Sequence, residues 1–240
     1  MRVAVVRFPG SNCEPEAYRA VERAGGSAFY LRHRDTSLGD ADAVILPGGF
    51  SYGDYLRCGA IARLSPVMDA IRRHATDGGP VLGICNGFQI LCEAGLLPGA
   101  LVRNAGLRYL SRPVDVRVER TDTPFTNAYR PGEVIRIPVG HGDGRFVAAE
   151  ETLDALEAGG QIVLRYVDRG MPDAAANPNG AMRDIAGVSN PRGNVVGLMP
   201  HPERLAEPVL GSDAGIGVFV SLMREGSAIG GPGGRPDYSS

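Results

Sequence analysis

The residues best suited to chemistry lie in one short stretch, Gly83-Ile84-Cys85-Asn86-Gly87. A run of β-favouring apolar residues leads to Cys85, and a helix-like run follows it directly. Glycines two residues before and after the cysteine give the G-x-S-x-G pattern of a nucleophile elbow, with a thiol replacing the hydroxyl. A sharp turn from strand to helix needs these glycines because the backbone segments approach closely. The pattern predicts Cys85 as a nucleophile at a helix N-terminus, where the dipole favours thiolate.

A thiol nucleophile needs a base, and a histidine base needs a group that orients it. His201 is the best candidate, since it follows an apolar strand and precedes Glu203 by two residues. In an extended segment such residues project to the same side, so we expect Glu203 to hold the His201 ring. His33 is expected in a solvated loop, His74 at a helix C-terminus, and His141 in a glycine-rich loop with a mainly structural role, contact with substrate or a partner being the alternative.

A tetrahedral intermediate also needs backbone N–H donors for its oxyanion. In an elbow one donor belongs to the residue after the nucleophile, here Asn86, and the glycine pair 48–49 follows a neighbouring strand. Gln89 lies four residues after Cys85 on the same side of the helix, within reach of a substrate. Each assignment has a structural alternative: a small buried hydrophobe for Cys85, a simple turn for residues 47–49, and a structural ring for His201. The other three cysteines are expected to be structural, and no spacing of ligands predicts a metal site.

Alternating strands and helices must position these residues. Apolar runs predict strands over residues 2–7, 28–31, 43–46 and 81–84, and helical spacing predicts helices over 14–24 and 65–75, the latter with Ser65 as N-cap. This order favours an α/β fold: a three-layer αβα architecture around a mostly parallel sheet.

The pattern changes after Gly95. Alternating apolar and polar residues at 114–119 and 134–139, with a run at 162–167, predict antiparallel additions to the sheet. A turn is expected at 177–180, a late strand at 194–199 and a final helix at 213–223. We expect one domain over residues 1–225 and a disordered tail, rich in Gly, Pro and Ser, over 226–240.

The composition excludes several classes of function. The chain has 240 residues, 43% hydrophobic and 22% charged, with a net charge of −2, which favours neither nucleic acid nor an anionic membrane. No apolar run nears the roughly 18 residues of a membrane span, and we expect no signal peptide. Four cysteines without framework spacing suggest reduced thiols in the cytoplasm. Every basic side chain is arginine, so a Walker lysine and a Schiff-base lysine are both absent.

The elbow with Gln89, together with His201-Pro202-Glu203, resembles the class I, triad-type glutamine amidotransferases. Longer stretches, at residues 9–13, 47–60 and 197–204, are similar to the glutaminase subunits of phosphoribosylformylglycinamidine synthase. The resemblance covers about residues 1–225. Asp143 stands where that family favours glutamate, and the segment after Gly226 has no counterpart.

The resemblance implies a flavodoxin-like fold and a triad of Cys85, His201 and Glu203. Cys85 would attack the side-chain amide of L-glutamine and form a γ-glutamyl thioester, with an oxyanion hole made by the N–H groups of Gly49 and Asn86. Ammonia would pass to a synthetase subunit that converts formylglycinamide ribonucleotide to the amidine in purine biosynthesis. This chain would need no cofactor, and ATP and Mg²⁺ would bind to the synthetase; a small third subunit is expected to complete the hetero-oligomer.

Two other functions remain open at this point. One is a stand-alone cysteine hydrolase on the same fold, such as a γ-glutamyl hydrolase or peptidase, which would be active without a partner. The other is a non-catalytic, regulatory module, which would be expected to lack a member of the triad.

Overall fold

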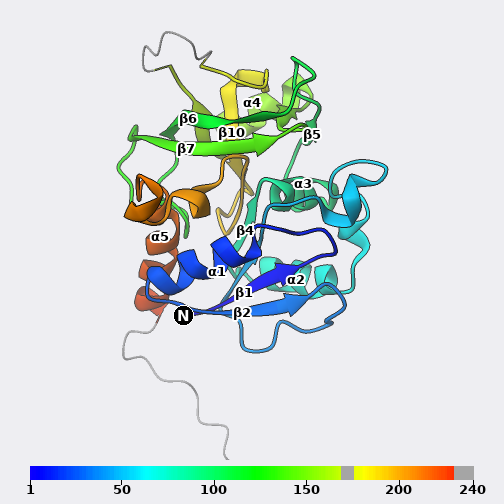
Figure 1. Ribbon diagram of the computed structural model, residues 1–240, viewed down its shortest axis with the longest axis vertical. Coiled ribbons are helices and arrows are strands. Elements are labelled where there is room, and N and C mark those ends of the chain that lie inside the picture. Colours follow the sequence, from blue (N-terminus) through cyan, green and yellow to red (C-terminus); the bar gives the residue numbers. More distant parts are fainter. Residues whose placement is uncertain (169–175, 230–240) are drawn as a thin grey trace, which may run out of the picture.

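The strands predicted before the elbow form, with one later strand, the parallel half of a nine-stranded sheet (Figure 1). The computed structural model describes residues 1–168 and 176–229, and within them the sheet has the order β2-β1-β3-β4-β11-β10-β9-β6-β7. The strands are β1 (Arg2–Arg7), β2 (Ser27–Arg32), β3 (Ala43–Leu46), β4 (Val81–Ile84), β5 (Ala100–Val102), β6 (Leu110–Val118), β7 (Val134–His141), β8 (Arg145–Val147), β9 (Ile162–Tyr166), β10 (Ile185–Ser189) and β11 (Val195–Leu198). The helices are α1 (Glu14–Arg23), α2 (Val67–Thr76), α3 (Asn86–Glu93), α4 (Glu150–Ala158) and α5 (Ile216–Ile229).

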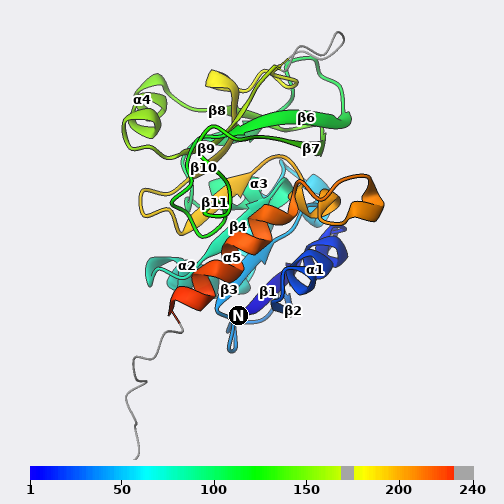
Figure 2. The same cartoon turned by 90° about the vertical axis from the view of Figure 1, so that its left-hand side faces the viewer.

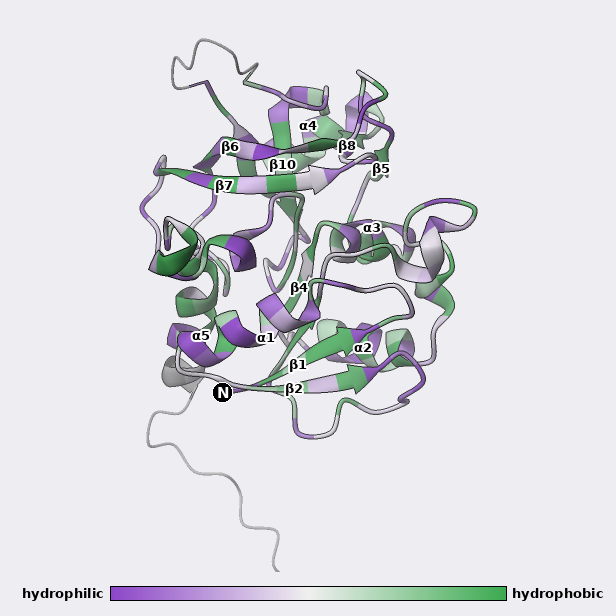
Figure 3. Cartoon of the chain, in the orientation of Figure 1, coloured by the Kyte–Doolittle hydropathy of each residue, from purple (hydrophilic) through white to green (hydrophobic). Residues whose placement is uncertain are grey.

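The parallel half consists of β2, β1, β3, β4 and β11. Every residue of β3, β4 and β11 is buried, as expected for parallel strands with helices over both faces. Helices α1 and α5 pack together on one face, and α2 and α3 lie on the other (Figure 2). Figure 3 shows the matching hydropathy: β1 is hydrophobic, whereas α1 on the surface is largely hydrophilic. The αβα architecture and the flavodoxin-like strand order are therefore confirmed.

The other half of the sheet is antiparallel, as the alternating patterns predict. β6 pairs with β7 over a register that runs from Leu110↔His141 to Arg117↔Val134. β9 joins β6 to β10, and β10 connects this half to β11. β5 and β8 form a separate two-stranded sheet beside it. β7 ends at His141, so its last two residues belong to the glycine-rich segment that the sequence predicts as a loop.

Two local expectations are wrong. Helix α2 begins at Val67, and Ser65 does not cap it, because its hydroxyl lies 3.0 Å from the Tyr52 hydroxyl instead. Helix α5 runs from Ile216 to Ile229, so the expected tail is helical over its first four residues. Within this extension Gly226 packs closely on the N-terminus, since a Cβ atom there would lie 3.1 Å from Met1 Cε. Residues 230–240 lie outside the described part of the chain.

The helices of the described chain also bear on membrane association. Within residues 1–168 and 176–229, no helix has both the length and the apolar character needed to cross a bilayer.

Candidate active site

Cys85 occupies the sharp turn between β4 and α3. Its φ of 50° and ψ of −102° lie outside the regions that residues with a Cβ atom normally adopt, so the backbone is strained at this point. The Cys85 N–H donates a hydrogen bond of 2.7 Å to the Leu198 carbonyl at the end of β11, which fixes the turn against the sheet. The nucleophile elbow that the glycine spacing predicts is thus present.

The two glycines of the motif are required by close backbone contacts. A Cβ atom on Gly83 would lie 2.6 Å from the carbonyl oxygen of Gly87, and one on Gly87 would collide with the carbonyl oxygen of Leu46. Any larger residue at either position would push α3 away from β3 and β4. The sequence pattern therefore reports a steric requirement of the turn.

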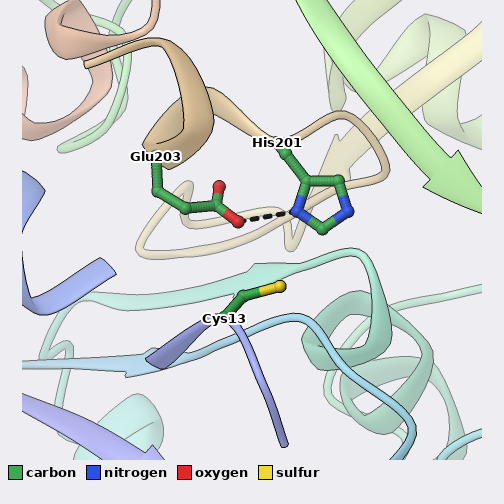
Figure 4. A group of neighbouring side chains, drawn as sticks. All are labelled: Cys13, His201 and Glu203. Atoms are coloured by element: carbon green, nitrogen blue, oxygen red, sulfur yellow. Dashed lines mark hydrogen bonds and ion pairs between the residues drawn. The ribbon is translucent and has the colours of Figure 1, made fainter. Parts of the chain in front are cut away.

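His201 and Glu203 form a buried pair beside the elbow. His201 Nδ1 and Glu203 Oε1 are 2.6 Å apart, and the two residues are only 1% and 3% exposed. Figure 4 shows the carboxylate and the ring facing each other. The pairing is as expected, but its reason is different: residues Pro202–Leu205 form a 3₁₀ turn, not an extended segment. The His201 N–H also donates to the Pro138 carbonyl of β7 at 2.8 Å, which joins the two halves of the sheet at this residue.

The electrostatics of this pair favour a protonated histidine. Burial alone lowers the pKa of His201, but the negative charges of Glu203 and of a Cys85 thiolate outweigh it and raise the pKa well above its usual value. His201 Nε2 has no hydrogen-bond partner within the described residues. The ring can therefore accept a proton at Nε2 while Glu203 stabilises the resulting charge.

Cys13, from the loop after β1, lies next to the same ring (Figure 4). Among the described residues, Cys13, His201 and Glu203 are the one group with metal-ligand donor atoms close together, all within 4.8 Å. One donor atom of each residue has a protein partner, since Arg204 Nη2 lies 3.1 Å from Cys13 Sγ and His201 Nδ1 pairs with Glu203 Oε1, whereas His201 Nε2 and Glu203 Oε2 have none within the described residues. Gly48 leaves the space for this arrangement, because a Cβ atom there would lie 2.7 Å from His201 Cε1 and 3.1 Å from Cys13 Sγ. We interpret the group as a hydrogen-bonded support of the ring.

A cavity of about 140 Å³ opens beside Cys85. It is lined by Gly49, Phe50, Asp54, Cys58, Cys85, Gln89, Tyr109, Gly140, His141, Gly142 and Asp143. Cys85 Sγ lies 3.7 Å from the Gly140 carbonyl, the partner of its S–H. A larger hollow of about 530 Å³ against α4 and β9 has no thiol or histidine in its walls. The small cavity, which contains the thiol of the elbow, is therefore the candidate substrate site.

Gln89 lies in the wall of this cavity, as its spacing predicts. Its amide is already engaged, because Nε2 donates to the Asp143 carbonyl at 2.7 Å and Oε1 accepts from Asn86 Nδ2 at 2.9 Å. In this geometry Gln89 connects the helix to the opposite wall of the cavity. Its direct contact with a substrate stays a prediction.

The two expected oxyanion donors lie on adjoining segments. Asn86 is the first residue of α3, so its N–H has no partner within the helix. Its side-chain oxygen accepts a hydrogen bond of 3.2 Å from the Ser51 N–H, which ties the elbow to the loop after β3. Gly49 in that loop has a φ of 147°, and a Cβ atom there would lie 2.7 Å from Ser11 Cα. Only glycine fits at this position.

Two further titratable side chains of the cavity are held neutral. Burial, with Asp54 and Asp143, raises the pKa of Cys58, so this second cavity thiol remains protonated. Burial and the neighbouring His201 lower the pKa of His141 to about 4. His141 thus lines the cavity, and its contact with a substrate stays a prediction.

The other two histidines lie elsewhere. His33 Nδ1 is 2.8 Å from the Tyr52 hydroxyl, so the ring is partly buried and paired instead of solvated. His74 lies near the end of α2, as expected, and burial lowers its pKa, which disfavours a charged ring there.

Two buried asparagines near the cavity were not singled out from the sequence. Asn104 and Asn179 are each 1% exposed, and both contact the segment between β7 and β8. Asn104 belongs to no local motif, whereas Asn179 lies in the predicted turn at residues 177–180. The turn signal at residues 177–180 is the one sequence feature that pointed to either of them.

Comparison with known proteins identifies the relatives of this chain. A family model described as a CobB/CobQ-like glutamine amidotransferase domain matches residues 1–214. A protein of Rubrobacter xylanophilus named phosphoribosylformylglycinamidine synthase subunit PurQ is 57% identical over 223 residues, 93% of this chain and 98% of the relative. One of the same name from Thermus thermophilus is 53% identical over 225 residues, 94% of this chain and 99% of the relative.

Solved structures of glutamine amidotransferases are also similar to this chain. A chain in the structure of PurLQS from Thermotoga maritima is 47% identical, with a TM-score of 0.83 over 93% of this chain and 98% of that one. Another glutamine amidotransferase of Thermotoga maritima shares the fold, with a TM-score of 0.60 over 94% and 97% of the two chains, at 18% identity.

Proposed function

Because the chain belongs to the CobB/CobQ-like glutamine amidotransferase family, we propose that Cys85, His201 and Glu203 are the catalytic triad of a glutaminase. The chain is the glutaminase subunit of phosphoribosylformylglycinamidine synthase, which supplies ammonia for purine biosynthesis in a complex with a synthetase subunit. The buried 2.6 Å contact between His201 and Glu203, next to a strained cysteine, supports the triad most directly.

The reaction proceeds in two halves. His201 takes the proton of the Cys85 thiol, the thiolate attacks the side-chain amide carbon of glutamine, and His201 then delivers this proton to the departing ammonia. The product is a γ-glutamyl thioester. Water, deprotonated by His201, attacks the thioester carbon and releases glutamate and the thiol. In both tetrahedral intermediates the N–H groups of Gly49 and Asn86 stabilise the oxyanion.

The division of work between subunits follows from the side chains in this one. The chain has no lysine for a Walker-type loop, so we assign ATP and Mg²⁺ to the synthetase and no cofactor to this chain. A small third subunit completes the proposed assembly. The four cysteines are free thiols, which suits the cytoplasm, and residues 1–225 are proposed as one amidotransferase domain.

Glutamate release from glutamine tests the proposal, measured for wild type and Cys85→Ala with and without the synthetase. We expect weak activity alone, stimulation by the synthetase and its substrates, and loss of activity in the variant. Ammonia supplied directly should still drive synthesis by the complex that contains Cys85→Ala. Undiminished glutamate release by the variant would refute the role of Cys85.

The same measurement tests the two alternatives. Full activity of the isolated chain, unaffected by the synthetase, would instead indicate a stand-alone hydrolase. Absence of glutamate release under all conditions would indicate the regulatory module.

A further inference from the structure

The segment Gly140–Gly144 forms one wall of the cavity, although it lies in the short connection from the end of β7 to β8. Four of its residues line the cavity. Two of its carbonyl groups face the catalytic side, since Gly140 O lies 3.7 Å from Cys85 Sγ and Asp143 O accepts a hydrogen bond from Gln89. If this chain binds glutamine here, as proposed above, the shape of the site depends on where this backbone is held.

Asn104, in the connection between β5 and β6, contacts three residues of this segment. Its Oδ1 accepts from the Gly144 N–H at 3.0 Å and from His141 Nδ1 at 3.1 Å. Its Nδ2 donates to the carbonyl groups of Arg108 at 2.8 Å and His141 at 3.0 Å. Its own backbone N–H donates to the Gly142 carbonyl at 2.9 Å. All donor and acceptor capacity of this buried amide is used, and most of it holds the segment.

These contacts also determine the tautomer of His141. The Asn104 Nδ2 group faces two carbonyl oxygens, so the amide has one possible orientation and its oxygen faces the ring. The ring must therefore carry its proton on Nδ1, and Nε2 is left without one. Because His141 stays neutral, His201 is the histidine near the cavity that takes up a proton during the reaction.

Asn179 supports the same segment from the other side. Its Nδ2 donates to the Gly144 carbonyl at 2.8 Å, and its Oδ1 accepts from the Ala181 N–H at 3.0 Å. Gly144 is thus held at its N–H by Asn104 and at its carbonyl by Asn179. The two asparagines lie far apart in the sequence, and neither lines the cavity.

We infer that Asn104 is the main positioning residue of the glutamine site, with Asn179 as a second, weaker one. Both act through the backbone of Gly140–Gly144, Asn104 acts also through the orientation of the His141 ring, and neither touches the substrate. A residue of this kind determines how well glutamine is held against Cys85. The chemistry of the bound substrate, which depends on the triad, should change much less.

The test compares Asn104→Ala and Asn179→Ala in the complex with the synthetase. Asn194→Ala is the matched control, since Asn194 is also buried and its Nδ2 donates to two carbonyls, of Ala75 and Gly79, at 2.8 and 2.9 Å. The kinetic constants for glutamate release give the KM for glutamine and kcat. Synthesis driven by added ammonia reports on the integrity of the complex, and thermal unfolding reports on folding.

We expect Asn104→Ala to raise the KM for glutamine about tenfold or more and to lower kcat by less than about threefold, because a small displacement of positioning groups weakens productive binding. Asn179→Ala should raise KM by a smaller factor. Ammonia-driven synthesis should persist in both variants. Asn194→Ala should lower the unfolding temperature and leave the KM unchanged.

An unchanged KM in folded Asn104→Ala would overturn the inference, and so would an equal rise in KM in Asn194→Ala. If Asn104→Ala does not fold, Asn179→Ala is the test: a raised KM for glutamine supports the inference, and an unchanged KM overturns it. Failure of the proposed function is recognised separately, because wild-type protein would then release no glutamate with the synthetase present.

Discussion

The two halves of the sheet contribute different things to one site. The parallel half supplies reactive groups: Cys85 after β4, the glycine loop after β3, and His201 with Glu203 after β11. The antiparallel half supplies a shaped wall of backbone, the segment after β7, with its carbonyl groups toward the thiol and Gln89. The reactive side chains and the wall that shapes the cavity therefore come from different halves of the sheet.

The physical basis of this division lies in how each half is built. The carboxyl ends of parallel strands meet at one edge of a sheet, so residues that follow β3, β4 and β11 converge without further support. A connection between antiparallel strands can adopt many shapes. The segment Gly140–Gly144 is fixed by buried amides from two other connections.

Glu203→Gln should have the largest effect among variants that test this division. Loss of the carboxylate removes the charge that raises the pKa of His201, and we expect kcat to fall about ten-thousandfold, as in a Ser-His-Asp triad whose Asp is replaced by Asn. KM should change little, because Glu203 does not line the cavity. Steady-state glutamate release in the complex measures both constants.

Glu93→Gln is the control for that change. Glu93 pairs with Arg57 at the far end of α3, so the same substitution there should leave kcat within about twofold. The proposed separation would be contradicted if Glu203→Gln raised KM and preserved kcat.

Gly87→Ala should have the next largest effect, on stability. The added methyl group would collide with the Leu46 carbonyl in the tightly packed elbow, and we expect unfolding to cost about 3 kcal/mol less than in wild type. Gly106→Ala, in a loop where a Cβ atom meets nothing within 4 Å, should be close to neutral. Equal stabilities of the two variants in denaturant titrations would refute the steric role of Gly87.

His141→Gln should have the smallest effect, and one that depends on pH. The pKa of His141 is about 4 in the folded state and about 6.5 when unfolded, so the unfolded chain binds more protons between these values. Wild type should therefore lose about 2 kcal/mol of stability through this group between about pH 7 and about pH 5. The stability that a neutral His141 contributes is fully present above the unfolded pKa of about 6.5, and it is lost as the pH falls towards the folded pKa of about 4.

The glutamine variant cannot take up that proton, so it should lose less stability over the same range. Denaturant titrations of both proteins at several pH values measure the difference. Parallel pH dependences would show that burial and the neighbouring His201 do not hold His141 neutral.

Most of the parallel half could be predicted from the sequence because its signals are local. Apolar runs located β1, β3 and β4, and two glycines located the elbow, since each pattern expresses a requirement of neighbouring residues. The pairing of His201 with Glu203 was predicted for the wrong reason. A 3₁₀ turn, not an extended segment, brings the two side chains together.

The sequence by itself determined the fold class, the elbow that holds Cys85 and the family. Only the tertiary structure decided what surrounds the cysteine: Cys13 and Arg204 beside the ring, the cavity at Cys58 and His141, and the two asparagines that hold its wall. The reason is physical. A turn is specified by residues a few positions apart, whereas a buried hydrogen bond between distant segments leaves no periodic trace in either of them.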